Sequence, residues 1–129
     1  MKKHILCVDD EPDIREMLQE VLTLKGYRVS TAAKPEPARK VVKEDPPQLI
    51  IMDFQIEEGD GFVLIEDIKG LGPNIPILLL TGAVFDRTVV RETIEKKVAR
   101  YLDKTASLST IVSEIQRLLG DTPAKPAPG

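Results

Sequence analysis

Acidic side chains directly follow two short apolar runs of the chain. Asp9 and Asp10 come after the first run, and Asp53 comes after another. Two like charges about 4 Å apart repel by ~4 kcal/mol at an effective dielectric of about 20, so a pocket that gathers them must raise a carboxylate pKa or hold a cation. Carboxylates without a neighbouring His or Cys ligand suit a hard ion that prefers oxygen, above all Mg²⁺. Lys104 would add a second positive charge on the opposite side of such a pocket.

These groups together define a candidate phosphoryl-transfer site. Asp53 is the candidate nucleophile, while a metal ion and Lys104 would neutralise charge on the transferring oxygens. Thr81 and Gly82 follow a further apolar run, where the hydroxyl and the N–H could bind a remaining oxygen and glycine would let the backbone approach closely. Each motif alone has a simpler interpretation, because acids favour helix N-termini and Thr-Gly is usually a turn. Their order along the chain favours the site.

Short apolar runs and helical patterns alternate along almost the whole chain. Three of the runs are continuous hydrophobes, which is typical of strands covered on both faces and therefore of a mostly parallel sheet. Five such units in strict alternation predict an α/β doubly wound sheet, which collects ligands at the carboxyl ends of its strands. The expected strands are Ile5–Val8, Tyr27–Thr31, Leu49–Met52, Pro76–Leu80 and Ala99–Leu102.

Proline, glycine and capping residues bound five expected helices. The first begins at Pro12, which suits the first helical position, and it ends at Lys25 and Gly26. Ser107 is the candidate N-cap of the last helix, whose apolar face runs to Leu119. The other three are expected from Pro35 to before Pro46, from Gly61 to about Lys69, and from about Asp86.

Length and composition indicate a single domain kept in a reducing compartment. The chain has 129 residues, a formal net charge of −3 and one cysteine, which cannot form an internal disulfide. No apolar stretch approaches the ~20 residues that a membrane-spanning helix needs. The mild acidity gives no basis for direct binding of nucleic acid. We therefore expect a cytoplasmic protein with one domain over residues 1–120 and a proline-rich flexible tail or linker over 121–129.

Two residues of the first apolar run are expected to have no role in chemistry. His4 is expected to face solvent just before the first strand, since no second ligand lies near it in the sequence. Cys7 is expected to be a small buried hydrophobe and not a nucleophile, because apolar burial raises a thiol pKa.

Four motifs in this order resemble the receiver domain of two-component response regulators, over roughly the first 119 residues. The resemblance implies the chemotaxis-receiver-like fold, in which five helices cover a five-stranded parallel sheet of strand order 2-1-3-4-5. It also implies a signalling protein that catalyses only its own aspartate phosphorylation and dephosphorylation, and is otherwise not an enzyme. The motifs are Asp9-Asp10-Glu11-Pro12, Asp53 with Gly61 eight residues on, Thr81, and Tyr101-Leu102-Asp103-Lys104.

The same resemblance implies a role for each acidic residue of the pocket. Asp53 would accept a phosphoryl group from the phosphohistidine of a sensor histidine kinase or phosphotransfer protein, in a Mg²⁺-dependent reaction. Asp10 and Asp53 would bind Mg²⁺ directly and Asp9 would bind it through water. The backbone carbonyl of Gln55 would supply a further metal oxygen. Lys104 would pair with the phosphoryl group or with the Asp53 carboxylate.

A switch to an output partner is implied as well. Thr81 and Tyr101 match the family's switch pair, in which the hydroxyl moves toward the phosphoryl group and the aromatic ring follows it inward. The face built from the fourth helix, the fifth strand and the fifth helix would then change shape for an output protein, which the sequence does not identify. A homodimer is one candidate for the assembled state.

The sequence departs from the family pattern in two loops near the candidate site. Ile56 and Glu57 stand where the family usually has Met-Pro, which adds negative charge near an anionic pocket. Thr105 stands where a proline normally follows the lysine in a cis bond. A cis bond costs ~2.5–4 kcal/mol before a non-proline residue, against about 0.5–1 kcal/mol before proline. The bond between Lys104 and Thr105 is therefore predicted to be trans.

Two alternative functions of other classes stay open beside the phosphorylated receiver. A pseudo-receiver would have the fold without a working switch and would act as a constitutive docking module. An aspartyl-phosphate hydrolase is disfavoured, because such enzymes typically carry the nucleophile on the first strand with a second acid two residues later and have a cap domain. Neither that motif nor the length for a cap is present in this sequence.

Overall fold

The fold is that of a computed structural model, whose described residues are 2–53, 61–82 and 97–121. Within these ranges five parallel strands form one sheet in the order β2-β1-β3-β4-β5, which confirms the predicted α/β doubly wound architecture. The strands are β1 (His4–Val8), β2 (Arg28–Ala32), β3 (Leu49–Met52), β4 (Ile77–Thr81) and β5 (Arg100–Asp103). The helices are α1 (Pro12–Leu24), α2 (Pro35–Glu44), α3 (Gly61–Leu71) and α5 (Leu108–Leu118).

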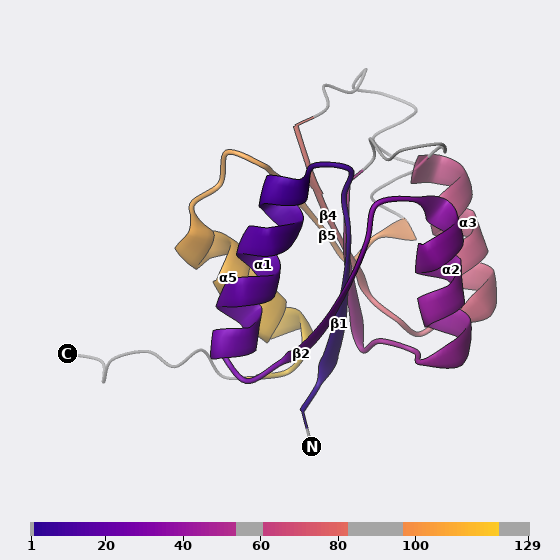
Figure 1. The fold of residues 1–129 in the computed structure, drawn as a ribbon, viewed down its shortest axis with the longest axis horizontal. Helices are drawn as coiled ribbons and strands as arrows, with labels where there is room; N and C mark the ends of the chain where they lie inside the picture. The colour runs from indigo at the N-terminus through magenta and orange to yellow at the C-terminus, as the bar shows by residue number, and fades with distance from the viewer. Residues whose placement is uncertain (1, 54–60, 83–96, 122–129) are drawn as a thin grey trace.

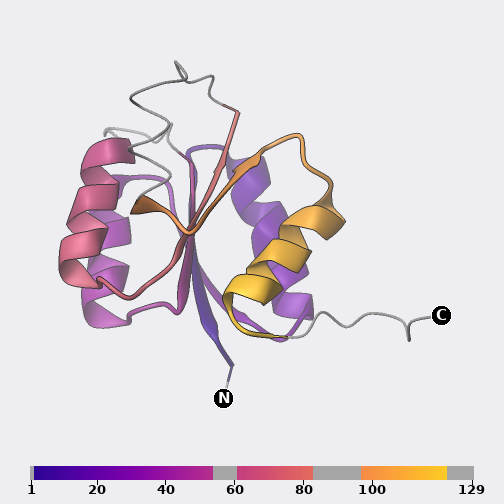
Figure 2. The ribbon, with the colours of Figure 1, turned by 180° about the vertical axis from the view of Figure 1, so that it is seen from behind.

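The helices cover the sheet on both faces. Helices α1 and α5 lie together on one face, and α2 and α3 lie on the other, as the front and back views both show (Figures 1 and 2). Each expected strand is found within one residue of its expected bounds. The helix expected from about Asp86 lies outside the described residues. None of the helices in the described ranges combines the length and apolar content needed to cross a membrane.

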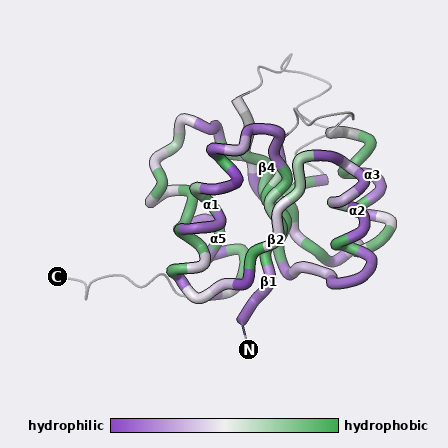
Figure 3. Tube along the Cα trace, in the orientation of Figure 1, coloured by the Kyte–Doolittle hydropathy of each residue, from purple (hydrophilic) through white to green (hydrophobic). Residues whose placement is uncertain are grey.

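The core consists of two apolar clusters, one on each face of the sheet. Along β1, Leu6 and Val8 belong to the cluster under α2 and α3, whereas Ile5 and Cys7 belong to the cluster under α1 and α5. Apolar side chains are therefore needed at every position from Ile5 to Val8, because successive side chains point to opposite faces. The resulting apolar centre is visible along the strands in Figure 3. Burial raises the pKa of the Cys7 thiol to about 12, in agreement with its expected role as a small hydrophobe.

The expectation that His4 faces solvent is wrong. The strand begins one residue earlier than predicted, so that His4 is part of β1 and is only 2% exposed. Its Nε2 lies 2.7 Å from the Ser30 hydroxyl, and its backbone N–H donates to Gln48 Oε1 at 3.1 Å. Pairing with β2 and the segment before β3 therefore draws this residue into the sheet.

Local sequence signals explain where the helices begin and end. Pro12 and Pro35 open α1 and α2, where the N–H that proline lacks would have no partner within the helix. After α1, Gly26 adopts a φ of +97°, and the N–H of Tyr27 donates to the Leu22 carbonyl at 3.0 Å. This is the glycine-terminated helix end that the sequence predicts. Ser107 caps α5, as predicted, by accepting the N–H of Thr110 at 3.2 Å.

Asp121, the last described residue, contacts residues near the start of the chain. One carboxylate oxygen lies 2.6 Å from Lys3 Nζ, and the other accepts the Tyr27 hydroxyl at 2.7 Å. Lys3 Nζ also donates to the Leu119 carbonyl at 2.7 Å. The end of α5 is thereby tied to the segments that enter β1 and β2.

Two of the described glycines with open surroundings, Gly26 and Gly70, are expected to respond oppositely to alanine. No described heavy atom lies within 4 Å of a Cβ placed at Gly26 or at Gly70, so only the backbone decides. Gly26→Ala should lower the free energy of unfolding by about 1–2 kcal/mol, because a side chain disfavours the positive φ. Gly70→Ala, inside α3, should raise it by up to about 0.5–1 kcal/mol. Urea unfolding of both variants checks this, and shifts of the same sign would contradict it.

Candidate functional site

The sheet brings two buried carboxylates together at one edge. Val8 of β1 lies opposite Met52 of β3 in the parallel register, so the following residues, Asp9 and Asp53, are neighbours. The Asp53 N–H donates to the Val8 carbonyl at 2.9 Å, which extends the ladder to the aspartate itself. Asp9 is 3% exposed and Asp53 is 1% exposed. Two acids at adjacent strand ends with so little solvent require a nearby positive charge.

Lys104 supplies that charge from the end of β5, the edge strand on the other side of β4. It directly follows β5, which is separated from β3 by β4, and its side chain extends to the ends of β3 and β1. Lys104 Nζ lies 2.5 Å from Asp53 Oδ2 and 3.0 Å from Asp9 Oδ2. The structure therefore joins residues from three strand ends that are distant in the sequence.

The pKa values follow from this arrangement. Burial raises the pKa of Asp9 to about 6, although the Glu11 N–H, at 2.9 Å from Oδ1, and the Lys104 ammonium both favour the ionised form. The neighbouring Asp53 charge raises it further. For Lys104, burial lowers the pKa, but hydrogen bonds to Asp53, Glu11 and Asp9 outweigh this and raise it above its usual range. Lys104 is therefore held in its charged form.

Four acidic residues at this edge form a set that fits a hard cation. Each offers a carboxylate oxygen, and these oxygens all lie within 4.8 Å of one another. Such a set matches Mg²⁺, which prefers oxygen ligands and usually takes one or two carboxylates together with waters. The residues are Asp9, Asp10, Glu11 and Asp53.

The structure describes three of the other four predicted site residues, Thr81, Gly82 and Tyr101. Thr81 is the last residue of β4 and stands opposite Asp103 of β5, so its backbone lies at the same edge as the acids. Gly82 is exposed, and no described atom lies within 4 Å of a Cβ placed there. Tyr101 is half-buried and packs against the cluster under α2 and α3. Gln55 lies outside the described residues.

The loop after Lys104 has a defined turn without a cis bond. The bond to Thr105 is trans, which confirms the prediction. Asp103 Oδ1 accepts both the backbone N–H and the hydroxyl of Thr105, each at 2.8 Å, and these bonds lower the pKa of Asp103. The Ala106 N–H donates to the Asp103 carbonyl at 2.9 Å. Aspartate and threonine thus build this turn by hydrogen bonding.

Sequence reasoning missed the part played by Glu11. Its Oε1 lies 2.5 Å from Lys104 Nζ, so that the ammonium contacts a third carboxylate. The available signal was the acidic residue directly before Pro12 at the start of a helix. An acidic residue is favoured at that position by the helix N-terminus, but the position does not indicate that its side chain contacts Lys104.

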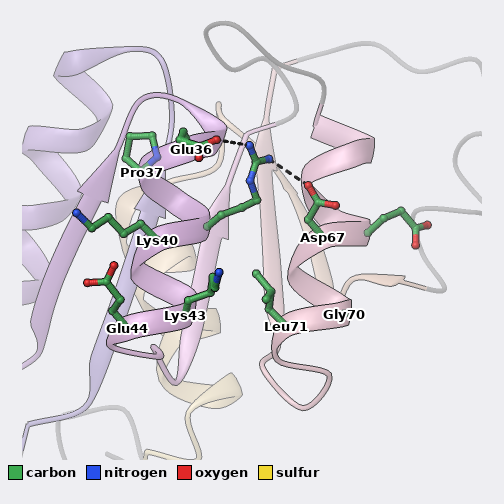
Figure 4. A pocket seen from close by; sticks show the side chains of 10 residues that line it. Glu36, Pro37, Lys40, Lys43, Glu44, Asp67, Gly70 and Leu71 are labelled. Atoms are coloured by element: carbon green, nitrogen blue, oxygen red, sulfur yellow. Dashed lines mark hydrogen bonds and ion pairs between the residues drawn. The ribbon is translucent and has the colours of Figure 1, made fainter.

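A separate groove of about 1010 Å³ lies between α2 and α3 (Figure 4). Arg39 crosses it and pairs with Glu36 Oε2 at 2.6 Å and Asp67 Oδ2 at 3.1 Å. Lys97 likewise pairs with Glu66 on α3. The groove does not include any of the residues that meet at the acidic edge.

Comparison with known proteins agrees with this geometry. A family model described as the response regulator receiver domain matches residues 5–116. The chain belongs to this family. Homologous receivers are parts of two-component signalling proteins, so the resemblance noted from the four sequence motifs is confirmed.

Several relatives of this receiver domain are longer than the chain or have known structures. A probable transcriptional regulator, ycf27, from Cyanidium caldarium is 36% identical over 90% of this chain and 46% of its own length. The receiver domain of HemR from Leptospira biflexa superposes with a TM-score of 0.82 and 26% identity, covering 97% of this chain and all of that one. The chain spans about half the length of the curated relatives it matches.

One structural relative carries a modification and a metal. It is a response regulator from Burkholderia pseudomallei with a phosphorylated aspartic acid, a calcium ion and citrate. Its TM-score is 0.78 at 27% identity, and the match covers 92% of this receiver domain and 69% of that chain.

Neutralising Asp9 should change how stability depends on pH. Because the folded pKa is raised to about 6, ionising Asp9 costs stability progressively as the pH rises from about 4 to above 6. Asp9→Asn should therefore be more stable than the wild type at pH 8 in EDTA, by up to about 3 kcal/mol, and should lose this advantage below about pH 4. Urea unfolding across this pH range is the measurement.

The exposed Asp13→Asn variant is the control for this pH dependence, because it removes a carboxylate from α1 away from the buried pair. If Asp9→Asn and Asp13→Asn follow the wild type in parallel at all pH values, the raised pKa of Asp9 is not supported.

Proposed function

We propose that this receiver is phosphorylated on Asp53 by the phosphohistidine of a sensor histidine kinase or phosphotransfer protein, in a Mg²⁺-dependent reaction. The observation that carries the proposal is the buried Asp53 carboxylate, 2.5 Å from the Lys104 ammonium and surrounded by further acids. The phosphorylated aspartic acid and calcium ion of the Burkholderia pseudomallei relative support the same chemistry.

The side chains divide the work of the transfer. An Asp53 oxygen attacks phosphorus, a P–O bond forms, the P–N bond breaks, and its electron pair leaves with the imidazole. Lys104 donates its N–H groups to the phosphoryl oxygens, which hold the charge that develops. Asp10, Asp53 and the Gln55 carbonyl would hold Mg²⁺, with Asp9 acting through water. The ion, when bound, neutralises charge on the transferring oxygens.

Residues at the end of β4, together with Tyr101, would respond to a phosphoryl group on Asp53. Thr81 and Gly82 follow the acids around the same edge, so the hydroxyl and the N–H there are assigned to a phosphoryl oxygen. Tyr101 lies in β5, is half-buried and packs against the cluster under α2 and α3. Its coupling to Thr81 would alter the face around β5 and α5 that an output protein recognises.

The wider role follows from the family and the length of the relatives. The receiver would act in the cytoplasm as a signalling unit over residues 1–120, with residues 121–129 as a tail or linker. Asp121, the first residue of this segment, pairs with Lys3 and Tyr27 and is held against the folded unit. It would catalyse only its own phosphorylation and dephosphorylation. The signal would pass to an output protein or to a second copy of the receiver.

Phosphorylation by a small donor tests the proposal. Incubated with acetyl phosphate and Mg²⁺, the wild-type chain should gain the mass of one phosphoryl group, on the Asp53 carboxylate that lies 2.5 Å from Lys104 Nζ. The gain should be absent in EDTA and in Asp53→Asn, and it should persist in the exposed Asp13→Asn control. Intact-mass spectrometry with peptide mapping reads the result.

Two results would contradict the proposal. Modification of Asp53→Asn to the wild-type level would place the phosphoryl group elsewhere. A wild-type chain that stays unmodified with both acetyl phosphate and beryllofluoride would instead favour a pseudo-receiver that docks without a switch.

A further inference from the structure

Glu11 differs from the other acids around Lys104 in how it is held. Asp9 and Asp53 are buried at strand ends, whereas the Glu11 side chain is 57% exposed. It occupies the N-cap position of α1 but makes no capping hydrogen bond, and the Asp9 carboxylate accepts the Glu11 backbone N–H instead. The Glu11 carboxylate is therefore free of the helix and extends to Lys104.

The ammonium of Lys104 forms ion pairs with all three acids. A lysine ammonium has three N–H donors, and it has three carboxylate partners here. Asp53 Oδ2 and Glu11 Oε1 both lie at 2.5 Å, and Asp9 Oδ2 lies at 3.0 Å. A phosphoryl group on Asp53 would present three oxygens where one carboxylate oxygen now contacts Lys104. A second N–H of Lys104 reaches these oxygens only if Glu11 or Asp9 gives up its contact.

We propose that Glu11 is a positioning residue that competes with the phosphoryl group for Lys104. This inference rests on the proposed function of Asp53. Before phosphorylation Glu11 holds one N–H of Lys104 toward the exposed side of the pocket, and the phosphoryl oxygens displace Glu11 and take over that donor. Glu11 is the contact released, because its carboxylate can return to water whereas that of Asp9 is buried.

The same carboxylate also belongs to the acidic set around the candidate metal position. Its negative charge there favours a divalent cation. Glu11 is therefore expected to act in opposite directions, strengthening the binding of Mg²⁺ and weakening the binding of a phosphoryl group. Replacing a residue that only stabilised the fold would not change the affinities for Mg²⁺ and for a phosphoryl group in opposite directions.

The test compares Mg²⁺ and beryllofluoride affinities in wild-type, Glu11→Gln and Glu11→Asp chains, using beryllofluoride as the probe of the phosphoryl group. At saturating Mg²⁺, Glu11→Gln should bind beryllofluoride about two- to five-fold more tightly, the range of an exposed ion pair. Its affinity for Mg²⁺ alone should fall. Glu16→Gln, an exposed change of the same kind on α1, should match the wild type in both measurements.

Glu11→Asp tests whether the contact with Lys104 depends on the length of the side chain or only on its negative charge. The shorter side chain keeps its charge near the metal position, and aspartate at an N-cap is drawn to the N–H groups of the first turn and away from Lys104. It should retain most of the Mg²⁺ affinity and should bind beryllofluoride more tightly, as Glu11→Gln does.

The outcomes distinguish this inference from the proposed function. If the wild type binds beryllofluoride but both Glu11 variants bind it no more tightly, the competition is refuted while the role of Asp53 stands. If both affinities of Glu11→Gln fall together, Glu11 serves the metal alone and the inference is likewise overturned. If the wild type fails to bind beryllofluoride at any Mg²⁺ concentration, both are refuted.

Discussion

The ammonium of Lys104 is the interaction on which the acidic edge depends. Asp9 and Asp53 lie side by side with almost no solvent, where two ionised carboxylates repel strongly. A buried ion pair contributes little net stability, but removing one partner leaves an uncompensated charge that is costly. Because the lysine comes from the end of β5, the site exists only if β1, β3, β4 and β5 pair in the observed order.

The division between predictable and unpredictable features follows from the range of the interactions. Continuous apolar runs predicted buried parallel strands, and Pro12, Gly26 and Ser107 predicted helix ends, because these signals act over a few residues. The contact between Glu11 and Lys104 depends on where β5 places the lysine, which no local pattern contains. The burial of His4 likewise depends on pairing with β2 and on Gln48, which lies far along the chain.

The two ends of the sheet have different tasks. At the carboxyl edge, charges converge from several strand ends, where four carboxylates form a set that fits a hard cation. At the amino edge, Asp121 joins Lys3 and Tyr27, so the chain leaves α5 in a fixed place. In the curated relatives, which are about twice as long, the chain extends beyond a unit of this size.

The pKa of Asp9 tests the central role of Lys104 most directly. It can be followed by carbon NMR of the aspartate carboxyl groups during a pH titration of the metal-free wild type and of Lys104→Met. Burial sets a pKa of about 6 in the wild type, while Lys104 pulls in the opposite direction. The account predicts that the pKa of Asp9 rises further when the ammonium is removed. An unchanged or lower value in Lys104→Met would contradict it.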